Sequence, residues 1–444
     1  MSVPRAAAAS LHVAEELRLH RLCCPACGAV LEDDGRVLAC PVAHAPALLR
    51  TVYPSRRLEP DERAVGLFRY RCWLPVAGAA PRSGPRTAVY RSRRLARAVG
   101  LERLWIAVNG HVPDRGATLP SGTFKDLEAR TVLARLGARD RHRPLVLASA
   151  GNTAAAFARA CADLGQRCLL IVPRSGLADL RFAGDRPPWV GIVSLVGGAD
   201  YTDAIDLADR VTADPGAGCI AAGGAANVAR RDGVGTTVLA AAERIGRIPD
   251  VYVQAVGSGA GAIAAHEAAV RLTGDGRFGE EPPRLLLSQN RPYAPMVDAW
   301  GARGTDVDCG GDARGRIRRI GAQVLSSRRP AYSVIGGVRD VLAASGGDML
   351  AVSNADAVAA SLLVEEMEGF DIDPAAAVAA ASLFPAVRDG VIPRRAAVLL
   401  NLTGAGRGLL DRSGCLPRPR PDLELGRADL DGPVALERVL ELLA

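Results

Sequence analysis

The sequence predicts an α/β protein in which helices cover parallel sheets. From about residue 86 onward, short apolar runs of strand length alternate with helical stretches, which is the pattern of parallel sheets. Hydrophobic residues make up 49% of the chain but aromatic residues only 4%, so the core is expected to consist of Ala, Val, Leu and Ile. The 444 residues are enough for two or three domains with a large core.

The expected elements follow in chain order. Residues 1–22 are expected to form a short helix, and a small cysteine module follows it. Amphipathic stretches such as 153–165 and 202–214 predict helices between the strands. Residues 416–421 predict a linker, and 434–444 a final helix. The buried strands are expected at 144–149, 168–173, 191–196, 250–256, 284–289 and 396–402.

Charge and hydropathy exclude several classes of partner. The net charge is +7, but the arginines are scattered in short runs such as 91–94 and 316–319. Without a clustered basic face or a binding motif, no nucleic-acid partner is expected. No apolar run reaches the ~18 residues of a spanning helix, so no membrane partner is expected. The first residues lack the apolar core of a signal peptide, which favours the cytoplasm.

Four metal-binding side chains lie close together in the N-terminal module. Cys24 and Cys27 form a Cys-Pro-Ala-Cys-Gly knuckle, and Cys40 and His44 follow it. Such a knuckle is typical of zinc ribbons, although Cys-x3-His replaces the usual second Cys-x-x-Cys. Two interpretations stay open here, a structural zinc site and a metal-free knuckle. The remaining cysteines, apart from Cys23, are widely spaced and are expected to be reduced core residues.

The chain contains a single lysine, Lys125, among 55 basic residues. Arginine can replace lysine for charge and for binding phosphate, but its guanidinium stays protonated and cannot act as an amine nucleophile. The retained lysine is therefore a candidate for Schiff-base chemistry. It lies in the segment 118–137, between small hydroxylated residues and a helical pattern.

Three further segments place small or hydroxyl side chains after a predicted strand. The segment 149–153, Ser-Ala-Gly-Asn-Thr, opens a helix and could hold a carboxylate or a phosphate on its amides. The Gly-Ser-Gly-Ala-Gly loop at 257–261 is a suitable phosphate cradle. Thr403 follows the last predicted strand and could bond a ring nitrogen. One ligand would satisfy the lysine and all three segments: pyridoxal phosphate, with its aldehyde, phenolic oxygen, phosphate and ring nitrogen.

These motifs resemble the threonine synthase branch of the fold type II pyridoxal-phosphate enzymes, and most closely the cysteate synthases. The residues that carry the resemblance are Ser-Gly-Thr-Phe-Lys-Asp, ending at Asp126, and the segments 149–159, 226–241, 248–265, 287–300 and 352–357. The resemblance implies a tryptophan synthase β-like fold: two three-layer α/β/α domains with the cofactor between them, plus the small ribbon-like module. The domains implied are 1–55 for the N-terminal module, 56–415 for the catalytic region with a smaller mobile part at about 140–245, and 416–444 for a linker and helix.

The resemblance also assigns roles to single residues. Lys125 would carry the cofactor as an internal aldimine, Asn152 would bond the cofactor's 3′-oxygen, and Thr403 its ring nitrogen. The phosphate would lie on Gly257, Ser258, Gly259, Ala260 and Gly261. The substrate carboxylate is expected at Ser149, Ala150, Gly151 and Thr153. Asn227, Arg230 and Arg231 are candidates for the leaving phosphate or the incoming anion.

The reaction implied is replacement of the phosphate of O-phospho-L-serine by sulfite, through an aminoacrylate intermediate, to give L-cysteate. Lys125 would remove the Cα proton. Threonine synthesis from O-phosphohomoserine and replacement by another nucleophile such as sulfide are alternatives, and a non-catalytic binding protein is a distant one. Coenzyme M synthesis and a specialised sulfonate pathway both stay open. Enzymes of this type are often dimers, so a homo-oligomer is expected.

Overall fold

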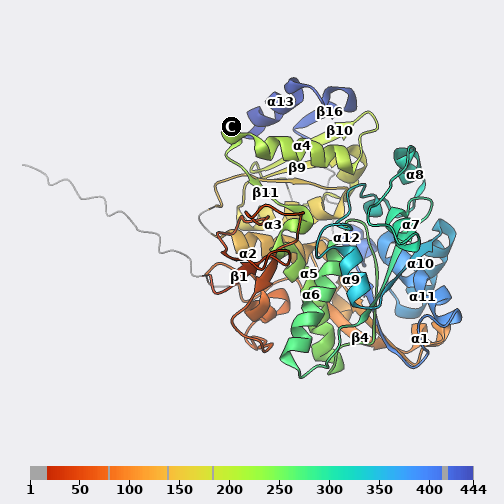
Figure 1. Ribbon diagram of the computed structural model, residues 1–444. Helices are drawn as coiled ribbons and strands as arrows, with labels where there is room; N and C mark the ends of the chain where they lie inside the picture. Colours follow the sequence, from red (N-terminus) through yellow and green to blue (C-terminus); the bar gives the residue numbers. More distant parts are fainter. Residues whose placement is uncertain (1–17, 79–80, 138–139, 183–184, 413–418, 444) are drawn as a thin grey trace, which may run out of the picture.

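The computed structural model describes residues 18–78, 81–137, 140–182, 185–412 and 419–443, and its main features are two sheets that lie one above the other in Figure 1. The larger sheet has six strands in the order β14-β13-β12-β15-β5-β4, all parallel except the edge strand β4. Its central strand β15 is buried at every residue, as expected for a parallel strand covered on both faces. The strands are β4 (Ala88–Ser92), β5 (Arg103–Val108), β12 (Val251–Ala255), β13 (Arg284–Asn290), β14 (Asp348–Val352) and β15 (Ala397–Leu402).

Helices cover both faces of the larger sheet. One apolar layer joins it to α1, α10 and α11, and a second joins it to α5, α6, α7 and α9. These helices are alanine-rich where they meet the strands, which lets them lie close to the sheet without large aromatic side chains. Their bounds are α1 (Arg94–Val99), α5 (Val228–Ile245), α6 (Ala260–Asp275), α7 (Pro295–Gly301), α9 (Val338–Ala344), α10 (Asn354–Glu368) and α11 (Pro374–Arg388).

The smaller sheet is a second three-layer unit. Its order is β11-β8-β9-β10-β16, and every pairing is parallel. Helices α2 and α3 cover one face, and α4 and α13 cover the other. The elements are β8 (Leu145–Ala148), β9 (Cys168–Pro173), β10 (Val190–Val196), β11 (Ile220–Ala221), β16 (Leu423–Gly426), α2 (Lys125–Leu136), α3 (Asn152–Leu164), α4 (Tyr201–Ala213) and α13 (Pro433–Leu443).

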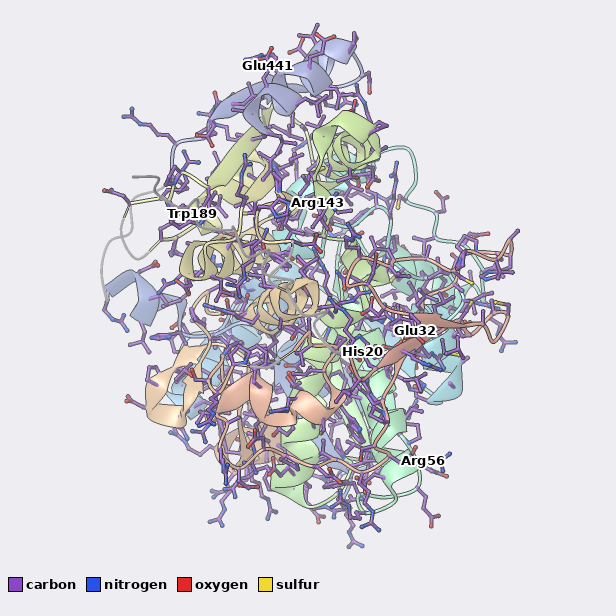
Figure 2. All side chains as sticks on the ribbon, turned by 90° about the vertical axis from the view of Figure 1, so that its left-hand side faces the viewer. His20, Glu32, Arg56, Arg143, Trp189 and Glu441 are labelled. Carbon is purple, nitrogen blue, oxygen red and sulfur yellow. The ribbon has the colours of Figure 1, made fainter. Side chains whose placement is uncertain are left out.

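The C-terminal segment does more than the linker and helix expected for 416–444. The helix forms as α13, but β16 precedes it and pairs with β10, with Val193 opposite Leu423. The tail thus completes the smaller sheet, and in Figure 1 its helix lies beyond α4 at the upper end of the molecule. In Figure 2, Glu441 of α13 and Arg56 mark opposite ends of the molecule.

The N-terminal module is a small antiparallel sheet, β2-β1-β3, formed by β1 (Arg21–Cys23), β2 (Val30–Glu32) and β3 (Arg50–Val52). The helix expected at 1–22 is therefore wrong at its end, because Arg21–Cys23 pairs as a strand, while residues 1–17 lie outside the described residues. His20 and Glu32 in Figure 2 mark this module.

The predicted fold class is confirmed: two helix-covered parallel sheets and a small cysteine-containing module. All six strands expected from the apolar runs form. The smaller sheet takes four of its strands from residues 145–221 and its fifth, β16, from the C-terminal segment. The helix α5 at 228–245 shares an apolar core with the larger sheet. Short elements complete the chain: β6 (His111–Val112), β7 (Ala117–Thr118), α8 (Ala313–Arg319) and α12 (Arg407–Arg412). Among the residues described, no helix combines the length and apolarity that crossing a membrane requires.

Candidate functional site

The candidate site is a cavity between the two sheets, at the carboxyl ends of their strands. The loop after β8 enters it from the smaller sheet, and the loops after β12 and β15 enter it from the larger one. Ligands of open α/β sheets bind at this edge, because strand ends there deliver loops and helix N-termini together. Of the predicted residues, the cavity is lined by Lys125, Ser149, Ala150, Gly151, Asn152, Thr153, Gly257, Ser258, Gly259, Gly261 and Thr403.

Lys125 is the first residue of α2 and lines the cavity with its side chain mostly buried. Its Nζ atom forms an ion pair with Oε1 of Glu128, one helical turn further on, and lies 4.6 Å from the centroid of the Phe124 ring. The amide of Phe124 donates a 2.9 Å hydrogen bond to the carbonyl of Thr403. This bond fixes the start of α2 against the loop after β15, so the amine and the Thr403 side chain face one cavity.

The glycine segment 257–261 leads into the first turn of α6 and has no room for side chains at its glycine positions. A Cβ atom at Gly259, where φ is +88°, would lie 2.3 Å from Cγ2 of Val338, and one at Gly257 would lie 2.8 Å from the carbonyl oxygen of Val324. The backbone therefore forms the cavity wall here, beside the N-terminus of α6. Ala260 is buried within the loop and does not line the cavity itself.

The segment 149–153 forms a second helix start at the cavity. The Ser149 hydroxyl accepts hydrogen bonds from the amides of Gly151 at 3.0 Å and Ala154 at 2.9 Å, so this side chain organises the loop. Gly151 has φ of +155°, and a Cβ there would lie 2.1 Å from a carboxylate oxygen of Asp179. Only glycine is compatible with this turn.

Asn152 lies at the contact between the two halves. Its Nδ2 donates to Asp373 at 3.3 Å, and its Oδ1 accepts from Arg407 at 3.3 Å. Asp373 immediately precedes α11 in the larger half, and burial raises the pKa of its carboxyl although the nearby Arg407 opposes this. The residue predicted to bond the cofactor oxygen therefore lines the cavity as part of a polar network.

Three predicted substrate residues do not line the cavity. Arg230 is buried, donates to the Ala222 carbonyl at 3.1 Å, and points an Nη atom at Glu128, 3.5 Å away. Arg231 pairs with Glu267 at 3.0 Å and donates to the carbonyl of Leu49 in the N-terminal module.

Asn227 has a structural role as the N-cap of α5. Its side chain accepts a 3.0 Å hydrogen bond from the amide of Ala229 and a 2.8 Å hydrogen bond from Arg135. The structure thus gives Asn227 and Arg231 packing and capping contacts where an anion-binding role was expected.

Several site residues escaped sequence reasoning. Tyr201 begins α4 and lines the cavity, and burial raises the pKa of its hydroxyl. Glu128 could have been found, because a residue three positions after a lysine at a helix start shares its face. Asp373 and Arg407 could not, because only the tertiary fold brings them to Asn152. The other lining residues that were not predicted are Phe124, Gln254, Ala255, Val256, Val324, Leu325 and Ala375.

The four predicted metal-binding side chains of the N-terminal module lie together. The ligand atoms of Cys24, Cys27, Cys40 and His44 all lie within 4.8 Å of one another. Burial acts to raise the pKa of the Cys24 thiol, but hydrogen bonds from the Cys27 and Ala26 amides outweigh it and lower the pKa to about 7. Three thiols and one imidazole in this arrangement fit the donor set of a structural zinc ion.

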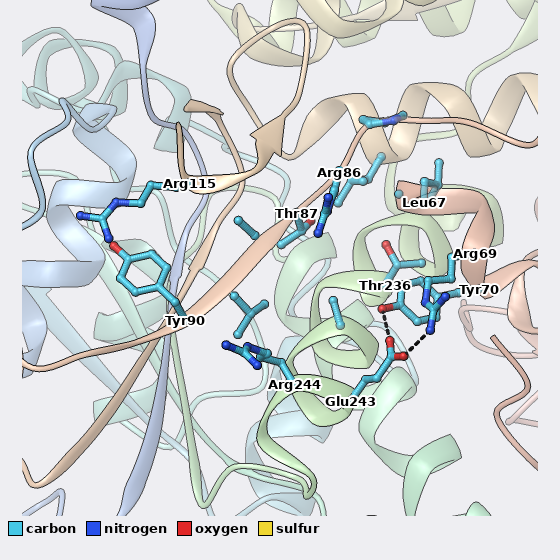
Figure 3. A pocket seen from close by; sticks show the side chains of 16 residues that line it. Leu67, Arg69, Tyr70, Arg86, Thr87, Tyr90, Arg115, Thr236, Glu243 and Arg244 are labelled. Carbon is cyan, nitrogen blue, oxygen red and sulfur yellow. Dashed lines mark hydrogen bonds and ion pairs between the residues drawn. The ribbon is translucent and has the colours of Figure 1, made fainter. Parts of the chain in front are cut away.

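A second hollow lies along β4 and α5, away from the lysine (Figure 3). Its wall contains Glu243, which accepts hydrogen bonds from Arg69 at 2.6 Å and Tyr70 at 2.8 Å, as the dashed lines show. Arg86 and Arg244 also lie along it. It offers no amine and no helix N-terminus, so it lacks the groups the predicted chemistry needs.

The cavity fits pyridoxal phosphate by the chemistry of its walls. It brings together three groups that the cofactor needs. The amine could bond the aldehyde, the glycine loop at a helix start could bind the phosphate, and the hydroxyl at a strand end could bond the ring nitrogen. Among its described lining residues Lys125 is the only cation.

Comparison with known proteins supports the same interpretation. A family model described as "Pyridoxal-phosphate dependent enzyme" matches residues 82–404. A cysteate synthase from Methanocorpusculum labreanum is 46% identical over 385 residues, which cover 85% of this chain and 91% of that protein. One from Methanosphaerula palustris is 47% identical over 392 residues, covering 87% and 90%. The solved structure of maize serine racemase matches with a TM-score of 0.54 at 18% identity, over 74% of this chain and 92% of the other, which shows the fold.

Proposed function

We propose, from the premise that the chain belongs to the pyridoxal-phosphate dependent enzymes and within them to the cysteate synthases, that it converts O-phospho-L-serine and sulfite to L-cysteate and phosphate. The observation that carries the proposal is the position of Lys125. The chain's single lysine lines the same cavity as the loops 149–153 and 257–261 and Thr403.

In this proposal the predicted residues that line the cavity have separate roles in binding the cofactor or in the reaction. Lys125 would hold the cofactor, the loop 257–261 its phosphate, Asn152 its phenolic oxygen and Thr403 its ring nitrogen. When bound, pyridoxal phosphate withdraws electrons from the substrate's Cα and so makes its proton removable. The amine of Lys125 would take that proton, and the loop 149–153 would orient the substrate by its carboxylate.

Anion recognition in this proposal depends on helix starts more than on arginine. Both substrates are anionic, yet neither Arg230 nor Arg231 lines the cavity. The starts of α3 and α6 present backbone amides to the same cavity, and Thr153, Ser258 and Tyr201 add hydroxyl groups. We infer that these groups hold the substrate carboxylate and the transferred anions.

Other parts of the proposal concern the assembly and its setting. The N-terminal module would hold one structural zinc ion on Cys24, Cys27, Cys40 and His44. A homo-oligomer, a cytoplasmic location and a role in sulfonate or coenzyme M biosynthesis stay predictions.

The experiment is an assay of the holoenzyme with paired substrates. Sulfite-dependent phosphate release from O-phospho-L-serine, with cysteate identified by mass spectrometry, is the expected result, and Lys125→Ala should abolish it. Sulfide replaces sulfite in a parallel assay. Faster turnover with sulfide would reassign the nucleophile, and threonine formed from O-phosphohomoserine in place of cysteate would reassign the enzyme.

A further inference from the structure

We propose that Glu128 is the positioning residue that receives the Lys125 ammonium when the lysine carries the proton taken from the substrate. This inference rests on the proposed function, because it gives the proton of that reaction a stated place. Glu128 lies on α2 three residues after Lys125, and its Oε1 atom forms an ion pair with Nζ.

Burial makes this pairing unusual. The Glu128 side chain is only 1% exposed, and a buried carboxylate without partners is very costly. Its Oε2 atom faces Nη1 of Arg230 at 3.5 Å, so the two carboxylate oxygens meet two cations. Arg230 in turn lies over the Phe157 ring, 5.0 Å from its centroid, and donates to the Ala222 carbonyl. Arg230 is thereby held in place and cannot turn away from Glu128 without losing these contacts.

The two oxygens of the Glu128 carboxylate contact two different partners, Arg230 and Lys125, which have different roles. Arg230 is always charged, so its contact with Oε2 holds the Glu128 side chain in place whatever the state of the lysine. Lys125 changes state during the reaction, since its amine is alternately bonded to the cofactor and free. The carboxylate thus offers the free lysine a charged acceptor that is buried beside the cavity.

The proton balance of the step is simple. The substrate's Cα–H bond breaks and an N–H bond forms at Nζ, which becomes an ammonium. The electron pair left at Cα forms the Cα–Cβ double bond, and the Cβ–O bond breaks, so the phosphate leaves with the electron pair of that bond. Glu128 accepts a hydrogen bond from the ammonium and remains a carboxylate throughout. When the nucleophile has added at Cβ, the proton returns from Nζ to Cα.

The first test measures the ion pair between Lys125 and Glu128 in the absence of catalysis. Because Lys125 is the only lysine, acetylation of the cofactor-free full chain by acetic anhydride gives one lysine adduct, which mass spectrometry separates from the α-amine adduct. Without the carboxylate the amine is no longer held as an ion pair, so Glu128→Gln should acetylate about 10-fold faster at pH 7.5, a change equal to about 1.4 kcal/mol. Glu128→Asp should lie between, and Glu243→Gln, which removes a carboxylate from the Arg69 pair, should match the wild type. An unchanged or slower rate in Glu128→Gln would overturn the proposal.

The second test measures removal of the substrate's Cα proton in the holoenzyme. With O-phospho-L-serine deuterated at Cα, Glu128→Gln should release phosphate about 10- to 100-fold more slowly and show a larger isotope effect, because the proton step becomes limiting. The cofactor's visible band and content should match the wild type, and Glu128→Asp should recover part of the rate. Loss of rate without a rise in the isotope effect would show a merely structural role. If the wild type fails to release phosphate, the proposed function fails, while the acetylation result still decides the pairing.

Discussion

The guanidinium of Arg407 donates a 2.8 Å hydrogen bond to the carboxylate of Asp179, and this bond joins the two halves of the molecule beside the cavity. Arg407 begins α12 just after β15 of the larger sheet, and Asp179 ends the short 3₁₀ helix Arg174–Asp179 that follows β9 of the smaller one. A second Nη atom of Arg407 donates to Asn152 at 3.3 Å. One side chain therefore connects the apposition of the halves to the residue predicted to bond the cofactor.

Replacing Arg407 should loosen that apposition. In Arg407→Met the bonds to Asp179 and Asn152 are lost, and Asp373 loses its nearby cation. We expect cofactor to dissociate about 5- to 10-fold faster, which corresponds to the ~1 kcal/mol of a partly exposed ion pair. The measurement is release of pyridoxal phosphate into excess apo-acceptor protein. Arg388→Met, which breaks an exposed pair with Asp389, is the matched control and should leave the rate unchanged.

Replacing glycine by alanine should have opposite effects on stability at the N-cap of α6 and inside the helix. Gly259→Ala forces a Cβ against Val338 at a positive φ, so it should reduce cofactor affinity at least 10-fold and destabilise the protein by about 1–3 kcal/mol. Gly274→Ala in α6 meets no atom within 4 Å, and should stabilise the protein by about 0.5–1 kcal/mol. Equilibrium titration with cofactor and urea unfolding measure the two. Equal effects of the two substitutions would refute the cradle assignment.

The cysteine module predicts bound metal. Wild-type protein should contain close to one zinc ion per chain by elemental analysis, and Cys27→Ser should contain almost none. Cys219→Ser, outside the module, should retain the zinc. Because Thr51 and Tyr53 donate hydrogen bonds of 2.6 and 2.7 Å to Asp232 on α5, loss of the metal should also lower the melting temperature of the whole protein. Zinc-free wild-type protein with an unchanged melting temperature would show the knuckle to be metal-free.

Asp126 predicts a pH dependence of stability. Burial raises the pKa of its carboxyl to about 7, with the Ser121 amide bond acting in the opposite direction. The unfolded chain releases this proton near pH 4, whereas the folded chain holds it to about pH 7, so this group's contribution falls as pH rises from about 4 to about 7. Asp126→Asn keeps an acceptor for Ser121 and cannot ionise. We expect it to raise the free energy of unfolding by a few kcal/mol at pH 8 and not at pH 4. An equal difference at both pH values would contradict this.

The sequence was sufficient for the main strands and the loops that follow them. Runs such as 168–173 are apolar at every position because both faces of the sheet are covered. The length of such a run and its unbroken apolar character are enough to predict a buried strand. It was insufficient for β16, whose four residues, Leu423–Gly426, become a strand only because β10 offers them a partner edge. Arg21–Cys23 was likewise assigned to a helix because strand pairing with β2 and β3 is not visible in local spacing.

In the candidate site, too, some residues could be predicted from the sequence and others could not. Lys125 and the two helix starts could be found because each combines special residue types with a position after a strand or at the start of a helix. The arginines could not be assigned, because the segment 227–231 supplies two of them and only the fold shows that Arg230 faces Glu128 while Arg231 faces Glu267. The hydrogen-bond network at Asn152 is formed by residues far apart in sequence, so no local sequence pattern could predict it.

The most direct test of the proposed activity is the product formed from O-phospho-L-serine labelled with ¹³C at Cβ, followed by NMR in the presence of sulfite and the holoenzyme. The account predicts that the labelled carbon becomes the sulfonate-bearing carbon of cysteate, with one phosphate released per cysteate, and that Lys125→Ala forms none. Unchanged O-phospho-L-serine alongside conversion of O-phosphohomoserine to threonine would contradict it.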